Sequence, residues 1–239
     1  MNKQISPLSP AKHRDIYIRS NDNFLQASED QLIPLVVQEV VDAATEFPVL
    51  FVKNSSTGEF TLVAMLGLKA QQNLYCSDES EQQYDANYAP LVLRNYPFYL
   101  QQSAEQQFAV CIDELSPLVN HDEGQKLFND NDEQTDFLKN KAESLIKFVE
   151  QQHITKGFIQ LLLEHDLLHP QKLTIRLNDN DPLTIDGIYM VDQQRLENLD
   201  DKVYATLRKN GALQIIHAHL MSMKQVNRLT RRLLKSANK

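Results

Sequence analysis

The stretch that decides the fold is residues 47–66, which read FPVLFVKNSSTGEFTLVAML. Two runs rich in β-forming side chains, residues 49–52 and 60–66, flank the polar, turn-forming segment 54–58. This arrangement predicts a β-hairpin, or two neighbouring antiparallel strands. Neither run alternates cleanly between apolar and polar residues, so we expect helices or loops to cover both faces of the sheet.

The segments nearest to this hairpin predict elements that pack against it. Residues 34–47 repeat apolar side chains at helical spacing, which predicts an amphipathic helix that starts near Pro34 and ends before Pro48. Residues 74–76 are a candidate extension of the sheet. Residues 108–112 form a short apolar run between polar clusters, which is typical of a buried strand.

A second hairpin is predicted from residues 172–177 and 183–191, which flank the turn-forming segment 178–182. Apolar repeats, capping residues and chain-breaking Pro or Gly indicate further helices. The predicted helices are residues 90–96, 136–168, 192–210 and 212–236. The sequence therefore predicts an α+β fold, with an antiparallel or mixed sheet built from hairpins and packed against several helices. We expect a single domain over residues 1–239.

Composition places the chain among ordinary globular proteins. Hydrophobic residues make up 42% of its 239 residues, and six Gly and nine Pro are too few for a low-complexity chain. No apolar run is long enough for a signal peptide or a membrane span, so we expect the chain to stay in the cytoplasm. Cys76 and Cys111 lack CxxC spacing, and we expect both to be reduced thiols.

Charge is polarised along the chain. Residues 224–239 carry six cations and no acid, so the other 223 residues carry −14 of a total net charge of −8. Residues 113–136 hold eight acids and one lysine, Lys126, and this segment is predicted to be an exposed acidic loop region.

Several segments across the chain resemble the bacterial SapC family. They are PLSPAKHR at 7–14, FPVLFVK at 47–53, GL at 67–68, residues 88–98, 110–113 and 116–118, GIYMVD at 187–192, and residues 210–223. The family takes its name from a surface-array system, so the resemblance implies a role near the cell envelope. Some relatives also occur beside genes for halogenase-like enzymes, cupin-like proteins and outer-membrane receptors. The resemblance supplies no catalytic residue.

Histidines are the first candidates for chemistry. His165 and His169 have a spacing that places two imidazoles on one helical face, as in metal sites. Pro170 disturbs this geometry and no third ligand is near, so a helix end is the favoured interpretation, and we predict no metal and no cofactor. His219 lies in the family-like segment 210–223 and is the most interesting histidine, although a satisfied core hydrogen bond is the favoured alternative.

Cys111 is a weak candidate nucleophile, because Asp113 lies on the same face of the predicted strand. A cysteine between Val110 and Ile112 is more often an inert hydrophobe. The chain contains no GxSxG, GxxxxGK[ST], HExxH, paired CxxC or GxGxxG pattern. The sequence therefore shows no recognisable catalytic site.

The basic amphipathic helix over residues 212–236 is the best candidate for an interaction surface. An ordinary packed helix with cations at its negative end is the favoured alternative. The acidic loop region is a second candidate, because clustered charge raises the rate of encounter with an oppositely charged partner. The candidate partner-binding residues are Arg228, Arg231, Arg232, Lys235, Asp130, Asp132 and Glu133.

We therefore expect a non-enzymatic accessory protein that binds another protein, in the envelope-linked or surface-layer pathway that the resemblance implies. The alternative is an enzyme or small-molecule binder with an unfamiliar site around His219 and the strand of Cys111 and Asp113. In that case the resemblance implies halogenase-like or cupin-like partner enzymes. Peripheral membrane contact through the last helix is a third, weaker alternative. The net charge of −14 on the rest of the chain argues against general nucleic-acid binding.

Overall fold

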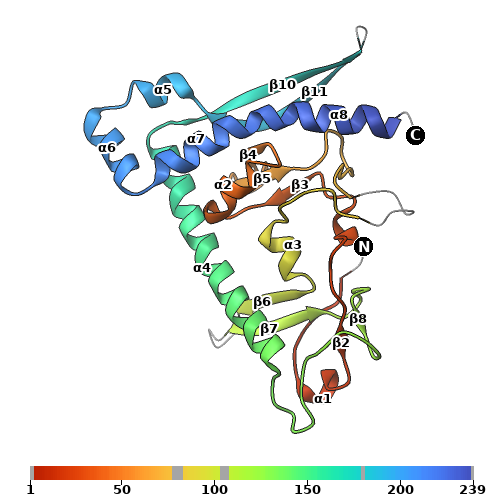
Figure 1. Ribbon diagram of the computed structural model, residues 1–239. Coiled ribbons are helices and arrows are strands. Elements are labelled where there is room, and N and C mark those ends of the chain that lie inside the picture. Colours follow the sequence, from red (N-terminus) through yellow and green to blue (C-terminus); the bar gives the residue numbers. More distant parts are fainter. Residues whose placement is uncertain (1–2, 77–82, 103–107, 179–180, 238–239) are drawn as a thin grey trace.

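The computed structural model describes residues 3–76, 83–102, 108–178 and 181–237. Across these residues, helices and antiparallel sheets form a single α+β domain, as predicted (Figure 1). A five-stranded sheet lies in the half of the molecule that contains the C-terminal helices. Two smaller sheets lie at the other end, and the long helix α4 runs between the two ends (Figure 1).

The five-stranded sheet has the order β10-β11-β4-β5-β3. Strands β4 (Val49–Lys53) and β5 (Phe60–Met65) pair antiparallel along their lengths, which confirms the predicted hairpin. Residues 49–51 and 62–65 are almost fully buried. Helix α7 packs on β4 and α4 packs on β5, so the hairpin is covered, as its uniform apolar sequence predicted.

The second predicted hairpin is confirmed and is longer than expected. Its strands are β10 (Leu168–Asn178) and β11 (Asp181–Val191), and it runs beside α8 in Figure 1. Strand β11 pairs with β4 at only two positions, Ile188 with Val52 and Tyr189 with Phe51. The two hairpins of the central sheet therefore share a short direct contact.

Helix α4 (Asp136–Glu164) connects the two hydrophobic cores of the molecule. It begins as predicted at Thr135, whose hydroxyl accepts a hydrogen bond from the Leu138 N–H. Leu138 lies in the core of the smaller sheets, and Leu162 lies in the core of the central sheet. The helix ends before the predicted residue 168, because Asp166 adopts a left-handed backbone with φ 51°.

The smaller sheets have the orders β1-β7-β6 and β8-β2-β9. Their strands are β1 (Ile5–Pro7), β2 (Tyr17–Ile18), β6 (Phe98–Gln102), β7 (Phe108–Asp113), β8 (Val119–Asn120) and β9 (Gln125–Lys126). Strand β7 confirms the strand predicted at 108–112. Residues 113–136 are not wholly loop, because they contain β8, β9 and the buried last residue of β7, Asp113.

The helix predicted over residues 34–47 is wrong in its first half. Pro34 ends strand β3 (Leu32–Pro34), and Val36 keeps an extended backbone with φ −101° and ψ 155°. Only η2 (Val37–Glu39) and α2 (Val40–Ala43) are helical. The Val36 N–H donates to the Glu39 carboxylate at 3.1 Å, so a side chain satisfies the backbone outside the helix.

The single helix predicted after Asp192 is two helices, α5 (Gln193–Glu197) and α6 (Asp201–Lys209). Asp192 caps the first one, as predicted. The Asp200 side chain accepts a hydrogen bond from the Lys202 N–H at 2.9 Å and so starts the second. The sequence did not indicate this break, because apolar residues keep helical spacing on both sides of it.

The proposed extension of the sheet at residues 74–76 is also wrong. Cys76 forms an isolated bridge to Tyr84, and Tyr75 is fully buried in the core of the central sheet. Its hydroxyl donates to the Glu46 carbonyl at 2.7 Å. The apolar character of this segment reflects side-chain burial and not sheet pairing.

The predicted final helix is nearly continuous. It consists of α7 (Ala212–Ser222), η3 (Met223–Gln225) and α8 (Val226–Ala237), and it follows Gly211, whose φ of 79° supplies the predicted left-handed stop. The remaining helices are α1 (Pro10–His13), η1 (Leu25–Ala27) and α3 (Leu91–Asn95), and α3 confirms the helix predicted at 90–96.

Two glycines provide a matched test of this packing. A Cβ at Gly67 would lie 1.9 Å from the Gln72 carbonyl oxygen, whereas a Cβ at Gly157 in α4 meets nothing within 4 Å. We expect Gly67→Ala to lower the free energy of unfolding by at least about 2 kcal/mol. Gly157→Ala raises it by about 0.5–1 kcal/mol, because alanine is the better helix former. Urea unfolding measures both, and equal effects would contradict the packing.

Candidate functional site

His219 is the histidine that the sequence ranked first, and its side chain is buried between two strands. The ring is 1% exposed and lies edge-on to Phe51, with ring centroids 5.2 Å apart. Its Nδ1 lies 2.7 Å from the Val49 carbonyl oxygen and donates to it, while its Nε2 accepts from the Val191 N–H at 3.1 Å. Burial lowers the pKa of His219 to about 4, so the ring is neutral near pH 7.

The register of β4 and β11 explains why an imidazole stands at this position. Continuing the pairing past Tyr189 and Phe51 brings Val191 opposite Val49, where the strands no longer bond directly. His219 bridges this gap. Ser222, one turn later in α7, accepts from the Val49 N–H at 2.8 Å. Both side chains complete the backbone hydrogen bonds of the sheet, which is the core hydrogen-bond alternative considered for His219.

Cys111 and Asp113 lie on β7 of a smaller sheet, whereas His219 lies at the central sheet, so these residues do not form one site. Cys111 is fully buried, and burial raises the pKa of its thiol, which disfavours the reactive thiolate. The Asp113 carboxylate accepts hydrogen bonds from the Gln4 and Leu115 N–H groups, at 2.9 and 3.2 Å. Asp113 therefore binds the backbone of the N-terminal segment and of the turn that follows β7.

His165 and His169 are not on one helical face. His165 is the residue that ends α4, whereas His169 lies in strand β10. The His169 ring lies 3.2 Å from the Asp166 carbonyl oxygen. Within the described ranges, no group of three or more His, Cys, Asp or Glu side chains is placed to hold a metal ion.

Sequence reasoning missed a polar cluster around Glu114. Its carboxylate accepts hydrogen bonds from Lys12 and Ser6, and the His13 Nε2 lies 3.1 Å from it. The hydrogen bonds from Lys12 and Ser6 are the main cause that lowers the pKa of Glu114 to about 2. An ionised carboxylate with several donors is stabilised and a poor nucleophile, so we assign the cluster to fastening residues 3–14 onto β7. The family-like segment 7–14 was its only sequence signal.

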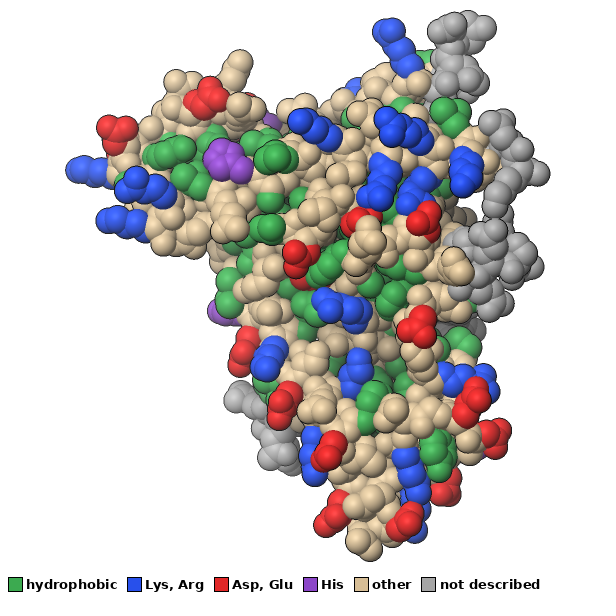
Figure 2. Space-filling model, in the orientation of Figure 1, with side chains coloured by type: hydrophobic (Ala, Val, Ile, Leu, Met, Phe, Trp, Pro, Cys, Tyr) green, Lys and Arg blue, Asp and Glu red, His purple; other side chains and the backbone are tan. Residues whose placement is uncertain are grey.

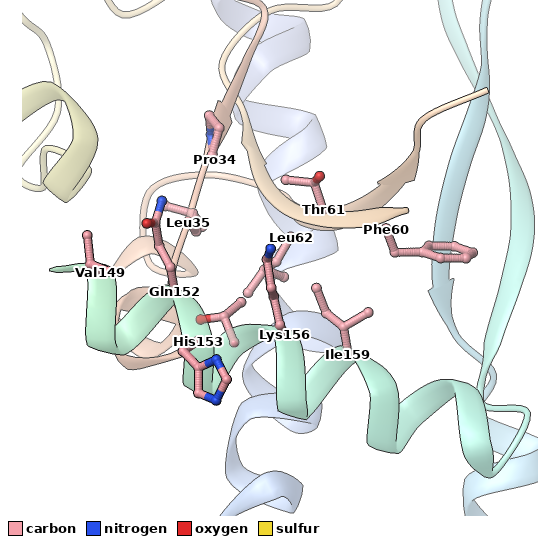
Figure 3. A pocket seen from close by; sticks show the side chains of 11 residues that line it. Pro34, Leu35, Phe60, Thr61, Leu62, Val149, Gln152, His153, Lys156 and Ile159 are labelled. Atoms are coloured by element: carbon pink, nitrogen blue, oxygen red, sulfur yellow. The ribbon is translucent and has the colours of Figure 1, made fainter. Parts of the chain in front are cut away.

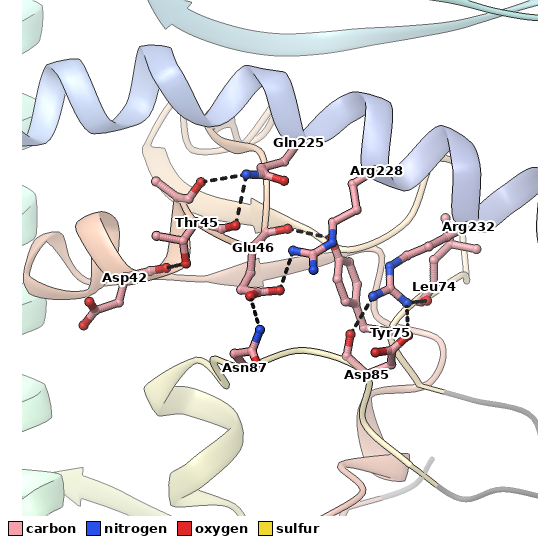
Figure 4. Close-up of polar contacts among 11 residues, drawn as sticks. Asp42, Thr45, Glu46, Leu74, Tyr75, Asp85, Asn87, Gln225, Arg228 and Arg232 are labelled. Atoms are coloured by element: carbon pink, nitrogen blue, oxygen red, sulfur yellow. Dashed lines mark hydrogen bonds and ion pairs between the residues drawn. The ribbon is translucent and has the colours of Figure 1, made fainter.

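The cations of the last helix divide into two sets. The inner cations are Arg228 and Arg232, which contact the body of the protein (Figure 4). Arg228 pairs with Glu46 at 2.6 Å, and the Glu46 side chain is only 5% exposed. The same carboxylate accepts from the Asn87 side chain at 2.8 Å. Arg228 therefore neutralises a nearly buried charge.

Arg232 is held by a loop on the same side of α8. Its guanidinium donates to the Asp85 carboxylate and carbonyl, each at 2.7 Å, and lies 4.3 Å from the centre of the Tyr75 ring (Figure 4). The inner cations therefore attach α8 to residues 46, 75 and 85. They are unavailable to a partner while these contacts hold.

The outer cations are Lys224, Arg231 and Lys235. They are exposed, and no hydrogen bond or ion pair joins them to another described residue. Figure 2 shows Lys and Arg side chains gathered over α8. The exposed apolar residues Met221 and Leu234, 67% and 39% exposed, lie among the same turns. This face is therefore a basic surface that also exposes apolar side chains.

The acidic candidates are exposed but paired within the chain. Asp130 lies 2.9 Å from Lys126, and Asp132 lies 2.5 Å from Arg14. Glu133 accepts a hydrogen bond from the Asn129 side chain at 2.9 Å. Cations of the chain itself therefore offset part of the acidic character that the sequence indicated.

The fold and these surfaces define a class of protein: a single-domain α+β protein of antiparallel sheets with an exposed basic helix face. A sequence profile of the SapC family matches residues 8–229 of the 239-residue chain. The chain belongs to the SapC family, as the resemblance of its segments predicted. No curated protein and no solved structure matches the chain.

The buried imidazole makes stability depend on pH. The unfolded chain protonates His219 near pH 6.5, whereas the folded chain resists protonation until about pH 4. Stability is therefore lost as pH falls from 6.5 to 4, by about 3 kcal/mol from this group. In urea unfolding at pH 7, 6, 5 and 4, His219→Gln is less stable at pH 7 but loses less stability on acidification. His217→Gln, an exposed neighbour, keeps the wild-type slope, and an unchanged slope in His219→Gln would contradict the assignment.

The two sets of cations should differ in their effect on stability. Arg228→Ala leaves the nearly buried Glu46 carboxylate without its cation, so we expect the free energy of unfolding to fall by about 1–2 kcal/mol. Arg231→Ala removes from the same helix an exposed cation that pairs with no residue in the described part of the chain, and we expect a change within about 0.5 kcal/mol. Thermal and urea unfolding compare the two variants. Equal losses would contradict the division into inner and outer cations.

Proposed function

We propose that this SapC-family chain is a non-enzymatic, cytoplasmic accessory protein that binds an acidic surface of another protein through the outer cations. The observation that carries the proposal is that the cations of η3 and α8 divide into a set that contacts the body of the protein and a set that is exposed. Arg228 and Arg232 hold the helix in place, while Lys224, Arg231 and Lys235 remain exposed and unpaired among the described residues. A fixed helix presents these charges at low entropic cost.

Electrostatics support a protein partner over nucleic acid. A net charge of −14 outside residues 224–239 repels a polyanion that is much larger than one helix face. A folded partner with a local acidic patch contacts only the basic face. Met221 and Leu234, near the two ends of this basic face, are exposed apolar side chains that can add apolar contacts to such an interface.

The acidic residues Asp130, Asp132 and Glu133 form a second, weaker candidate surface, because Lys126 and Arg14 already offset part of their charge. The outer cations Arg231 and Lys235 lie outside residues 8–229, which the family profile matches. The proposal therefore rests on this chain's own surface. The envelope or surface-layer setting of the function rests on what the SapC resemblance implies.

The alternative sites considered in the sequence receive less support. His219 in α7 hydrogen-bonds to the backbone of the central sheet, whereas Cys111 and Asp113 lie together on β7 of a smaller sheet, where Cys111 is buried and Asp113 accepts backbone hydrogen bonds. No described helix is long and apolar enough to cross a membrane. Attachment of α8 to an anionic membrane surface competes with the protein-partner proposal and is distinguished by experiment.

The proposal predicts capture of one dominant protein from a lysate of the native organism. We expect the full-length chain to capture it at low salt, and we expect capture to weaken as salt screens the contact. The double variant Arg231→Glu/Lys235→Glu loses at least about ten-fold in affinity for the purified partner, because attraction becomes repulsion. Binding is measured by calorimetry after mass spectrometry identifies the partner.

The matched control is Lys147→Glu/Lys209→Glu, which makes the same change in charge at exposed positions on α4 and α6. It keeps the affinity. Circular dichroism and melting temperature establish that both variants fold. Equal binding by both double variants would overturn the assignment to the outer cations, as would flotation with anionic liposomes in place of protein capture. Asp130→Lys/Asp132→Lys/Glu133→Lys tests the second surface in the same assay.

A further inference from the structure

A pocket of about 380 Å³ lies between helix α4 and the edge of the central sheet, and its described lining comes from residues 34–35, 60–62 and 149–159 (Figure 3). Strand β3 pairs with β5 only at residues 63–65, and the Leu35 N–H then bonds to the Leu62 carbonyl. No described strand continues beside the first residues of β5, Phe60 and Thr61, on that side. The open edge and α4 form the two walls of the pocket.

The floor of this pocket is apolar and well fixed. Leu35, Leu62 and Ile159 are 4%, 1% and 6% exposed and belong to the core of the central sheet. Thr155 links α4 to the segment after β3, because its hydroxyl accepts a hydrogen bond from the Val37 N–H at 2.9 Å and donates one to the Gln151 carbonyl. The pocket is therefore formed before a ligand arrives, which lowers the cost of binding.

The rim of the pocket carries a cation and an amide. Figure 3 shows the side chains of Gln152 and Lys156 extending from α4 toward the strands, whereas the His153 ring points away from them. No hydrogen bond or ion pair joins Gln152 or Lys156 to another described residue. Among the described residues that line the pocket, none is acidic. The site therefore presents hydrogen-bond donors and positive charge above an apolar surface.

We propose that this pocket binds a small apolar molecule that carries one carboxylate. The apolar body lies on Leu35, Leu62 and Ile159. The carboxylate accepts hydrogen bonds from the Lys156 ammonium and the Gln152 amide at the rim. Pockets of this size with few convergent polar groups are typical of small-molecule sites. This inference does not depend on the proposed partner surface, because it concerns different elements.

Octanoate is the probe, with 1-octanol and octylammonium as neutral and cationic counterparts, all below their aggregation limits. We expect octanoate to bind the full-length chain more tightly than either counterpart, as measured by calorimetry. Amide shifts in two-dimensional NMR should centre on Leu62 and Ile159. Lys156→Gln weakens octanoate binding about ten-fold, which corresponds to the 1.4 kcal/mol of a charge-assisted hydrogen bond.

Lys147→Gln is the matched control, because it removes from α4 an exposed cation that lies outside the pocket and pairs with no described residue, and it leaves octanoate binding unchanged. Both lysines are exposed, so we expect both variants to fold with wild-type melting temperatures. The proposal is overturned by equal binding of octanoate and 1-octanol, by an equal effect of the two substitutions, or by amide shifts centred on another part of the chain. Absence of octanoate binding at millimolar concentration would do the same.

Discussion

The hydrogen bonds of His219 join the two hairpins of the central sheet where the strands no longer pair with each other. Without the imidazole, the Val191 N–H would lose its bond to Nε2, and the Val49 carbonyl would keep only the longer contact with the Ser222 hydroxyl at 3.4 Å. Leaving a buried polar group unsatisfied costs about 1–3 kcal/mol. The same contacts fix α7 against β4, and α8 follows from α7. The position of the basic helix face therefore depends on a neutral histidine in the core.

The side chains of the last helix have three different roles that its composition does not distinguish: core packing, attachment to the body of the protein, and exposed charge. Its apolar residues Val226, Leu229 and Leu233 are buried in the core of the central sheet. The inner cations next to them contact Glu46, Asp85 and Tyr75, and the outer cations face solvent. A charge at the boundary of a core is favourable only with a partner, whereas an exposed charge needs none. This difference separates structural from available cations.

The charge of the acidic region is offset by the N-terminal segment. Strand β1 pairs with β7, and β2 pairs with β8 and β9. The strands of the N-terminal segment therefore lie beside residues 111–126, at the beginning of the acidic region. Lys12, Arg14 and Arg19 then pair with Glu114, Asp132 and Glu123. Segments about a hundred positions apart therefore neutralise each other. Net charge along the chain overstated the polarity of the folded surface.

Local sequence determined the elements whose signals are short-range. Both hairpins, the Thr135 start of α4, and the stop at Gly211 were predictable, because turn residues, caps and positive φ act within a few residues. The α+β class and the SapC family followed from the order of elements and from matching segments. The break at Asp200 and the extended backbone of Val36 were missed. Both depend on backbone N–H groups that bond to side chains, and the spacing of apolar residues does not report such bonds.

Only the tertiary structure decided what the candidate side chains do. Arg228 and Arg231 are both cations of one basic helix in the sequence, but in the fold Arg228 pairs with Glu46 and Arg231 is exposed. His219 became a bridge because α7 crosses the ends of β4 and β11, and Lys156 faces a pocket because β3 ends early. A sequence specifies which groups can bond or carry charge. Burial and the partners brought close by folding decide which of them remain free to act.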